Sequence, residues 1–213
     1  MRPIVVTAGP FAASDADGIA TSQKPAATFT LDGALVSGGV ALLGAARRVL
    51  FTTTADETTR TFTVTGTNAA GDVLSETLAG VNNTTTYTTL DFYTVTRVTV
   101  SGTLAGNVTI GTNGVGGSPW VRLDEWALPN VSVQTVVSGT INYTVQYSDD
   151  DPNSPTDAVL PSAMTWSTLA AGTGSSAVTN AAYAPLWVRI LVNSNTNPAY
   201  VRATVVQTGV VPL

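Results

Sequence analysis

Residues 61–65 read Thr-Phe-Thr-Val-Thr, and this stretch decides the fold class. In an extended strand successive side chains point to opposite faces, so Phe62 and Val64 share one face while three threonines line the other. Threonine, valine and aromatic residues favour strands because their side chains pack well on a pleated surface. The same alternation recurs in further runs at 97–101, 107–111, 141–147, 187–190 and 200–207. The sequence therefore predicts an all-β fold.

Turn-forming residues separate these runs at a spacing of about 8–12 residues, which is typical of a β-sandwich or jelly roll. Clusters of Asn, Asp, Ser, Gly and Pro occur at 32–33, 68–72, 82–83, 113–114, 138–139 and 149–155. The one helix-like candidate, residues 35–48, is rich in glycine and valine. We expect this segment to be strand or loop rather than helix.

A glycine-rich stretch suggests where the chain divides. Residues 111–119 contain four glycines and a proline, a composition typical of flexible connections. We expect two β-sandwich or jelly-roll-like domains joined by this Gly-rich linker, a Thr-rich domain over 25–115 and a Trp-containing domain over 118–213. Residues 1–24 contain Pro3 and Pro10 and have little periodicity. They are predicted to form an extended N-terminal arm that reaches onto a neighbouring subunit.

The composition argues for contact with other proteins and against nucleic acid. Only 11% of the residues are charged, and the chain contains 36 threonines. A neutral, hydroxyl-rich surface suits a protein whose surface lies largely against other protein. The net charge is -5, and the single Lys24 and eight arginines form no basic stripe, so no nucleic-acid partner is expected. The longest apolar stretch, residues 38–43, is too short for a membrane helix, and no signal peptide is indicated, so we expect a soluble protein made in the cytoplasm.

The residue types that carry most catalytic chemistry are missing from the sequence. There is no histidine and no cysteine, which removes Ser-His-Asp and Cys-His machinery and imidazole or thiolate zinc sites. Carboxylates remain, and Asp149 to Asp151 lie together before a Pro/Asn/Ser loop. They fit a calcium loop or a hydrolase acid pair, but a charged loop tip is the favoured interpretation because no distal glutamate follows. We expect no catalytic residue, metal or cofactor.

Arginine and aromatic residues on alternating strands are the candidates for an interface. Arg189 lies two positions from Trp187, and Arg202 lies two positions from Tyr200, so each pair shares one face of its strand. These residue types are enriched at interface hot spots, although a solvated face with Arg stacked on its neighbour fits equally well. Trp120 and Trp126 complete the candidate set. Asp124 and Glu125 beside Trp126 also fit a sugar-binding pair, but a core tryptophan is the favoured interpretation.

Several segments together carry a resemblance to a known family. They include the runs at 26–35 and 47–52, the Thr-rich strand at 61–67, and the runs at 71–77 and 106–111. In the second half, the runs at 120–124, 139–147, 187–190 and 205–207 continue the pattern. The chain resembles the β-rich virion proteins of tailed bacteriophages, which accompany capsid and neck proteins. The similarity consists of strand and turn patterns, and it carries no catalytic residue.

The resemblance implies a β-sandwich assembly part, most directly a capsid decoration (cement) protein. Such a protein bridges neighbouring capsomers of the major capsid protein and is often a homotrimer. The implied location is the virion. A neck or tail ring or collar component is an alternative within the virion, since the sequence lacks the repeats of a fibre shaft. A carbohydrate-binding β-sandwich module is an alternative of a different class.

Overall fold

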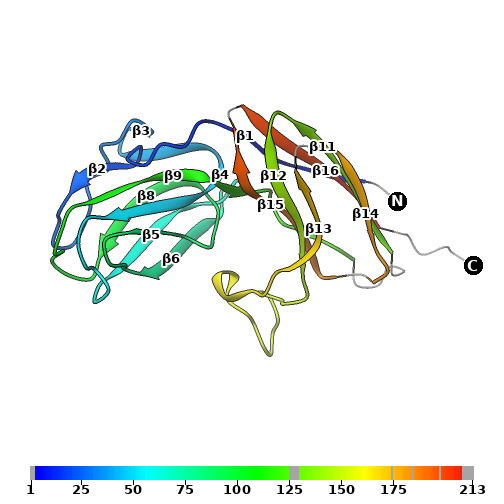
Figure 1. The fold of residues 1–213 in the computed structure, drawn as a ribbon. Helices are drawn as coiled ribbons and strands as arrows, with labels where there is room; N and C mark the ends of the chain where they lie inside the picture. Colours follow the sequence, from blue (N-terminus) through cyan, green and yellow to red (C-terminus); the bar gives the residue numbers. More distant parts are fainter. Residues whose placement is uncertain (1–2, 125–129, 174, 184, 197, 208–213) are drawn as a thin grey trace, which may run out of the picture. The chain divides into compact units, whose positions relative to one another are not determined.

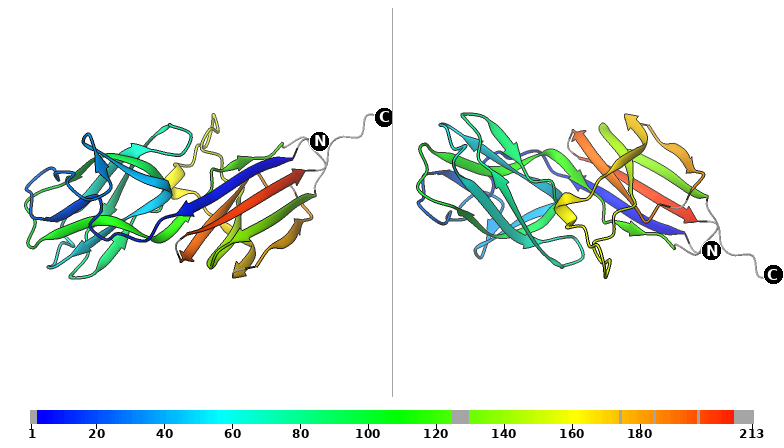
Figure 2. Two further views of the ribbon diagram at one scale, coloured as in Figure 1. Left: turned by 90° about the horizontal axis from the view of Figure 1, so that it is seen from above. Right: turned by 90° about the horizontal axis from the view of Figure 1, so that it is seen from below.

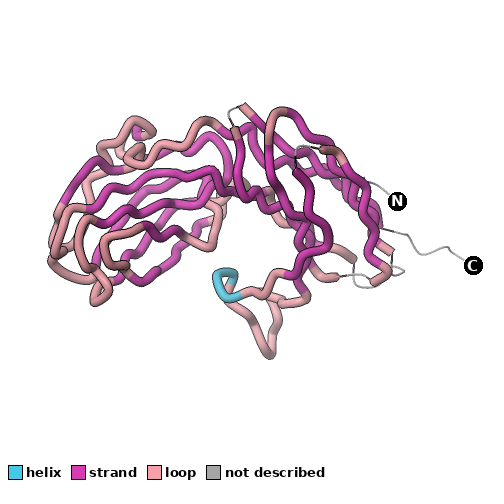
Figure 3. The backbone as a smooth tube through the Cα atoms, viewed as in Figure 1, coloured by secondary structure: helices cyan, strands magenta, loops and turns pink. Residues whose placement is uncertain are grey.

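The structure, a computed structural model, describes residues 3–124, 130–173, 175–183, 185–196 and 198–207 (Figure 1). Regular structure in this part of the chain consists of β-strands and one short 3-10 turn at Pro161–Ala163 (Figure 3). The all-β prediction is confirmed. The chain divides into two compact units, residues 13–115 and residues 1–12 with 116–213. We call them the Thr-rich unit and the Trp-containing unit.

Antiparallel strands build the Thr-rich unit. The order β6-β5-β8-β4 forms its central ladder, while β3 and β7 pair with β4, and β2 pairs with β9. The strands are β2 (Ala20–Gln23), β3 (Val36–Ser37), β4 (Val40–Thr53), β5 (Thr61–Thr67), β6 (Val73–Ala79), β7 (Thr85–Tyr87), β8 (Phe92–Val100) and the first part of β9 (Val108–Gly117). The segment 35–48 is therefore strand and turn, as expected.

The core of the Thr-rich unit confirms the alternation read from residues 61–65. Phe62 and Val64 are fully buried, and the rings of Phe51 and Phe62 stack with their centroids 4.9 Å apart. On the opposite face of the same strand, the hydroxyl of Thr63 lies 2.8 Å from that of Thr77 on β6. Threonine thus supplies cross-strand hydrogen bonds on the outer surface while the apolar residues of the same strands form the core.

Two buried carboxylates in the Thr-rich unit hold loops. Oε1 of Glu57 accepts hydrogen bonds from the backbone amides of Ala105 and Gly106, at 2.8 and 2.7 Å. Glu76 accepts from the amide and hydroxyl of Thr89 and from the amide of Leu90. Because these oxygens satisfy backbone donors that would otherwise be buried alone, both glutamates have a structural explanation.

The Trp-containing unit contains two sheets that face each other as layers (Figures 1 and 2). The first has the order β1-β16-β11-β14, and the second joins β13, β12, β15 and β10. The strands are β1 (Ile4–Phe11), β10 (Val121–Arg122), β11 (Val131–Ser138), β12 (Ile141–Ser148), β13 (Ser167–Thr173), β14 (Ala177–Ala181), β15 (Trp187–Asn195) and β16 (Ala199–Gln207).

The space between these two sheets is the core of the Trp-containing unit. Val133 and Val201 of the first sheet and Val145 and Ile190 of the second are buried. A hydrogen bond of 2.7 Å between the hydroxyls of Thr135 and Tyr143 joins the layers inside this apolar core. The unit is therefore a β-sandwich whose two sheets are also joined by a buried polar contact.

The predicted Gly-rich linker is wrong, because β9 continues through Gly111 and Gly114 to Gly117. Gly116 and Gly117 are buried and pair with β15. Glycine is needed for close approach rather than for flexibility: a Cβ atom on Gly111 would lie 2.0 Å from the carbonyl oxygen of Asp15. A strand that passes close to another backbone can therefore have the same glycine-rich composition as a flexible linker.

The predicted arm over residues 1–24 is also wrong for the described residues. β1 pairs along its length with β16 of the same chain, and β2 pairs with β9. The N-terminal segment thus supplies one strand to each unit, and the unit boundaries differ from the expected 25–115 and 118–213. Proline and alanine hid this role, since Gly9 and Pro10 lie in an irregularity of β1 that interrupts the alternation.

Candidate interaction surface

The candidate residues read from the sequence fall on two different faces of the Trp-containing unit. Trp187 and Arg189 lie on the face of β15 that points away from the sandwich core, because Val188 and Ile190 point into it. Tyr200 and Arg202 lie on the corresponding outer face of β16, because Val201 and Ala203 are buried. The sixth candidate, Trp126, lies outside the described residues.

Arg189 is buried within its own unit, with 5% of its surface exposed. The guanidinium carbon lies 3.8 Å from the ring centre of Trp166 and 5.9 Å from that of Trp120. Nε of Arg189 donates a 3.0 Å hydrogen bond to Oε1 of Gln146 on β12. The aromatic contacts and this hydrogen bond offset part of the cost of removing the guanidinium from water, and its flat, weakly hydrated shape suits such stacking.

The rings around Arg189 form a compact group that we call the Trp–Arg cluster, made of Trp120, Trp166, Trp187 and Arg189. Trp120 meets Trp166 edge-on, with ring centroids 5.1 Å apart, and Trp187 at 6.2 Å. Two segments far apart in the sequence, which carry Trp120 and Trp166, thereby cover the outer face of β15. The cluster packs the unit together, so Arg189 is not the exposed interface residue that the strand pattern allowed.

The outer face of the β1-β16-β11-β14 sheet is exposed and mostly uncharged. Tyr200 is 37% exposed, and Val5, Val178 and Val206 expose larger fractions on the same face of the sheet. Arg202 is the only charged residue in these four strands. In the described part of the chain no carboxylate lies within ion-pair distance of Arg202. Of the two candidate faces, this one can meet a partner without rearrangement.

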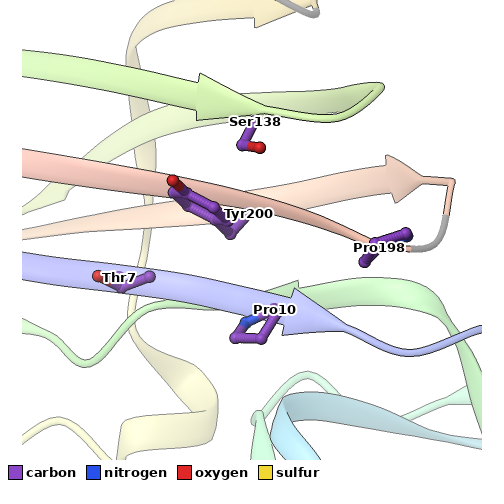
Figure 4. Close-up of a pocket in the computed structure, with 5 residues that line it drawn as sticks. All are labelled: Thr7, Pro10, Ser138, Pro198 and Tyr200. Atoms are coloured by element: carbon purple, nitrogen blue, oxygen red, sulfur yellow. The ribbon is translucent and has the colours of Figure 1, made fainter.

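A shallow depression of about 400 Å³ lies on this face (Figure 4). It is lined by Thr7 and Pro10 of β1, Ser138 of β11, and Pro198 and Tyr200 at the start of β16. Arg202 borders it, since Arg202 is the direct cross-strand neighbour of Thr7. The depression combines apolar walls with one cation at its rim, which suits an apolar side chain accompanied by an acidic group.

The acidic segment Asp149 to Asp151 forms internal hydrogen bonds. Asp150 accepts a hydrogen bond from the amide of Thr165, and Oδ1 of Asp151 accepts from the amide of Asn153 at 2.9 Å. Within the described residues, no group of three or more acidic side chains is placed to hold a metal ion. Asp150 and Asp151 thus bind backbone amides of their own loop and hold its shape.

One tyrosine in the same unit has a shifted ionisation. Burial, a hydrogen bond with Tyr147 and the negative charge of Asp149 raise the pKa of Tyr183 to about 12. The two rings meet edge-on at 5.2 Å. A higher pKa keeps the phenol protonated at neutral pH, the opposite of what a tyrosine acting as a base requires.

Sequence reasoning missed several residues of these surfaces. Trp166 and Gln146 hold Arg189, and Pro10 and Pro198 wall the depression, but none of them shows a signal of its own in the sequence.

In the described part of the chain no helix is long and apolar enough to cross a membrane. No family model matches the chain, and no curated protein is significantly similar to it.

Proposed function

We propose that the chain is a non-enzymatic structural protein of a tailed-phage virion that decorates the capsid and stabilises the shell by bridging capsomers. Its partners in this proposal are the major capsid protein and further copies of itself, in a homotrimer. Stabilisation requires no reaction: binding to the assembled shell and not to its dissociated subunits shifts the equilibrium toward the shell.

The exposed face of the β1-β16-β11-β14 sheet is the observation that carries the proposal. A rigid sheet presents valine and tyrosine side chains to solvent with Arg202 as its one charge. Apolar residues gathered on one face of a soluble domain typically mark a protein contact. The low charge of the whole sequence supports the same idea, because much of its surface is suited to lie against other protein.

The two alternatives receive less support. A ring component of the neck or tail would also need an exposed, uncharged contact face. The mass of the purified assembly distinguishes such a ring from a trimer. For a carbohydrate-binding module, the candidate sugar platforms are Trp120 and Trp126, and Trp126 lies outside the described residues. The ring of Trp120 is already in contact with Trp166, Trp187 and Arg189. That packing favours a structural role for Trp120.

Val178 offers a test of the proposed contact face. It is 63% exposed on β14, so an aspartate there should leave the fold intact while placing a charge in the contact. We expect Val178→Asp to weaken binding to purified capsids of the encoding phage by about tenfold or more. Co-sedimentation of the purified chain with these capsids measures the effect.

Val73→Asp is the matched control, because Val73 is 77% exposed on β6 of the other unit. We expect this variant to bind capsids as the unmodified chain does. Equal loss of binding in both variants, or full binding by Val178→Asp, would rule out this face as the capsid contact. Circular dichroism of both variants checks that each remains folded.

A further inference from the structure

An apolar side chain projects from the long loop between β12 and β13. Leu160 is 71% exposed, and it directly precedes the 3-10 turn. The loop is drawn in yellow in Figure 1, where it extends away from the strands of its unit. An exposed leucine alone is ordinary, but this one lies on a loop with several internal hydrogen bonds and prolines.

Backbone hydrogen bonds and prolines hold this loop in one shape. The carbonyl oxygen of Asp151 accepts from the amides of Ser154 and Val159, and that of Leu160 accepts from the amide of Ala163 at 2.8 Å. Met164 is buried at its base. Pro152, Pro155 and Pro161 further restrict the backbone. Leu160 is therefore presented by a preorganised loop, which lowers the entropy cost of inserting it into a partner.

The chain also carries a receptor of matching chemistry. The depression at Tyr200 is walled by Pro10, Pro198 and the tyrosine ring, and its volume of about 400 Å³ accommodates a leucine side chain. Arg202 at the rim has no carboxylate within ion-pair distance among the described residues. Asp157, exposed three residues before Leu160, likewise forms no ion pair in the described chain.

We propose that copies of this chain associate with Leu160 of one copy in the Tyr200 depression of the next, and with Asp157 opposite Arg202. The inference rests on the self-association included in the proposed function, and it names the contact. The loop that carries Leu160 and the Tyr200 depression are different surfaces, so the contact is head-to-tail. It closes into a ring when the rotation between copies allows it. A three-membered ring is the trimer of the proposed function.

A charge swap tests the pairing in the full-length chain. We expect Arg202→Asp and Asp157→Arg each to raise the dissociation constant of self-association about tenfold or more, measured by analytical ultracentrifugation. The double variant should recover most of the lost affinity, because the two charges are exchanged rather than removed. Arg97→Asp combined with Asp157→Arg is the control, since Arg97 is exposed on β8 of the other unit, and it should show no recovery.

Leu160→Ser tests the apolar half of the contact, with Val73→Ser as its matched control. The inference expects the first to weaken self-association about tenfold or more and the second to leave it unchanged. An oligomer unaffected by Leu160→Ser, or a charge swap without recovery, overturns this contact and leaves capsid decoration standing. Recovery by the swap in a protein that ignores capsids supports the contact and contradicts decoration.

Discussion

Replacing Gly111 by alanine is expected to destabilise the Thr-rich unit by about 3 kcal/mol or more. The added Cβ would lie 2.0 Å from the carbonyl oxygen of Asp15 and 2.4 Å from the carbonyl carbon of Ala16. Both are backbone atoms, so neither can turn aside as the end of a flexible side chain would. Hydrogen exchange at the amides of β4, β5 and β8 measures the loss of stability in this unit.

Gly102→Ala is the control for this substitution. Its Cβ would meet only the end of the Arg60 side chain, at 3.3 Å, which can move. We expect a change within about 0.5 kcal/mol. If the β4, β5 and β8 amides are equally protected in Gly111→Ala and Gly102→Ala, residues 111–117 behave as a flexible linker. That result would contradict the continuous strand β9.

Replacing Arg189 by alanine is expected to cost the Trp-containing unit about 3 kcal/mol. The substitution removes a cation that lies 3.8 Å from the ring centre of Trp166 and leaves a cavity next to the rings of Trp166 and Trp120. Arg189→Lys should recover only part of this loss, because an ammonium group lacks the flat surface that stacks on the rings. Urea unfolding followed by tryptophan fluorescence reports on this unit, which contains all four tryptophans.

Arg97→Ala gives the comparison for Arg189. Arg97 is exposed on β8, and its loss should change stability by less than about 0.5 kcal/mol. If Arg189→Ala proves as stable as Arg97→Ala, then the Trp–Arg cluster contributes no packing energy. In that case Arg189 would again be a candidate for contact with a partner.

Alternation predicted the strands well because it is a local property. Phe62 and Val64 are buried because strand geometry places both on one face, and the five residues 61–65 suffice to show this. The glycines of β9 wrongly predicted a flexible linker, because the reason for these glycines is not local in the sequence. Gly111 is required by the backbone of Asp15, which lies 96 positions away in the sequence and cannot be seen from composition.

The candidate interface residues show the same difference between local patterns and long-range packing. The sequence placed Arg189 and Arg202 in equivalent positions, each two residues from an aromatic residue on one face of a strand. Only the fold distinguishes them, because Trp120 and Trp166 arrive from other segments to cover Arg189, while nothing described covers Arg202. Which outer face of a sandwich is covered depends on loops and long-range packing, and period-two patterns carry no information about either.

Our proposal is that this chain acts through contact, as a building block of a virus particle. Its most direct test is quantitative mass spectrometry of intact, purified particles of the encoding phage. We expect the chain to be present in many copies per particle, in a fixed ratio to the major capsid protein. Absence of the chain from intact particles, or presence only in traces that further purification removes, would contradict it.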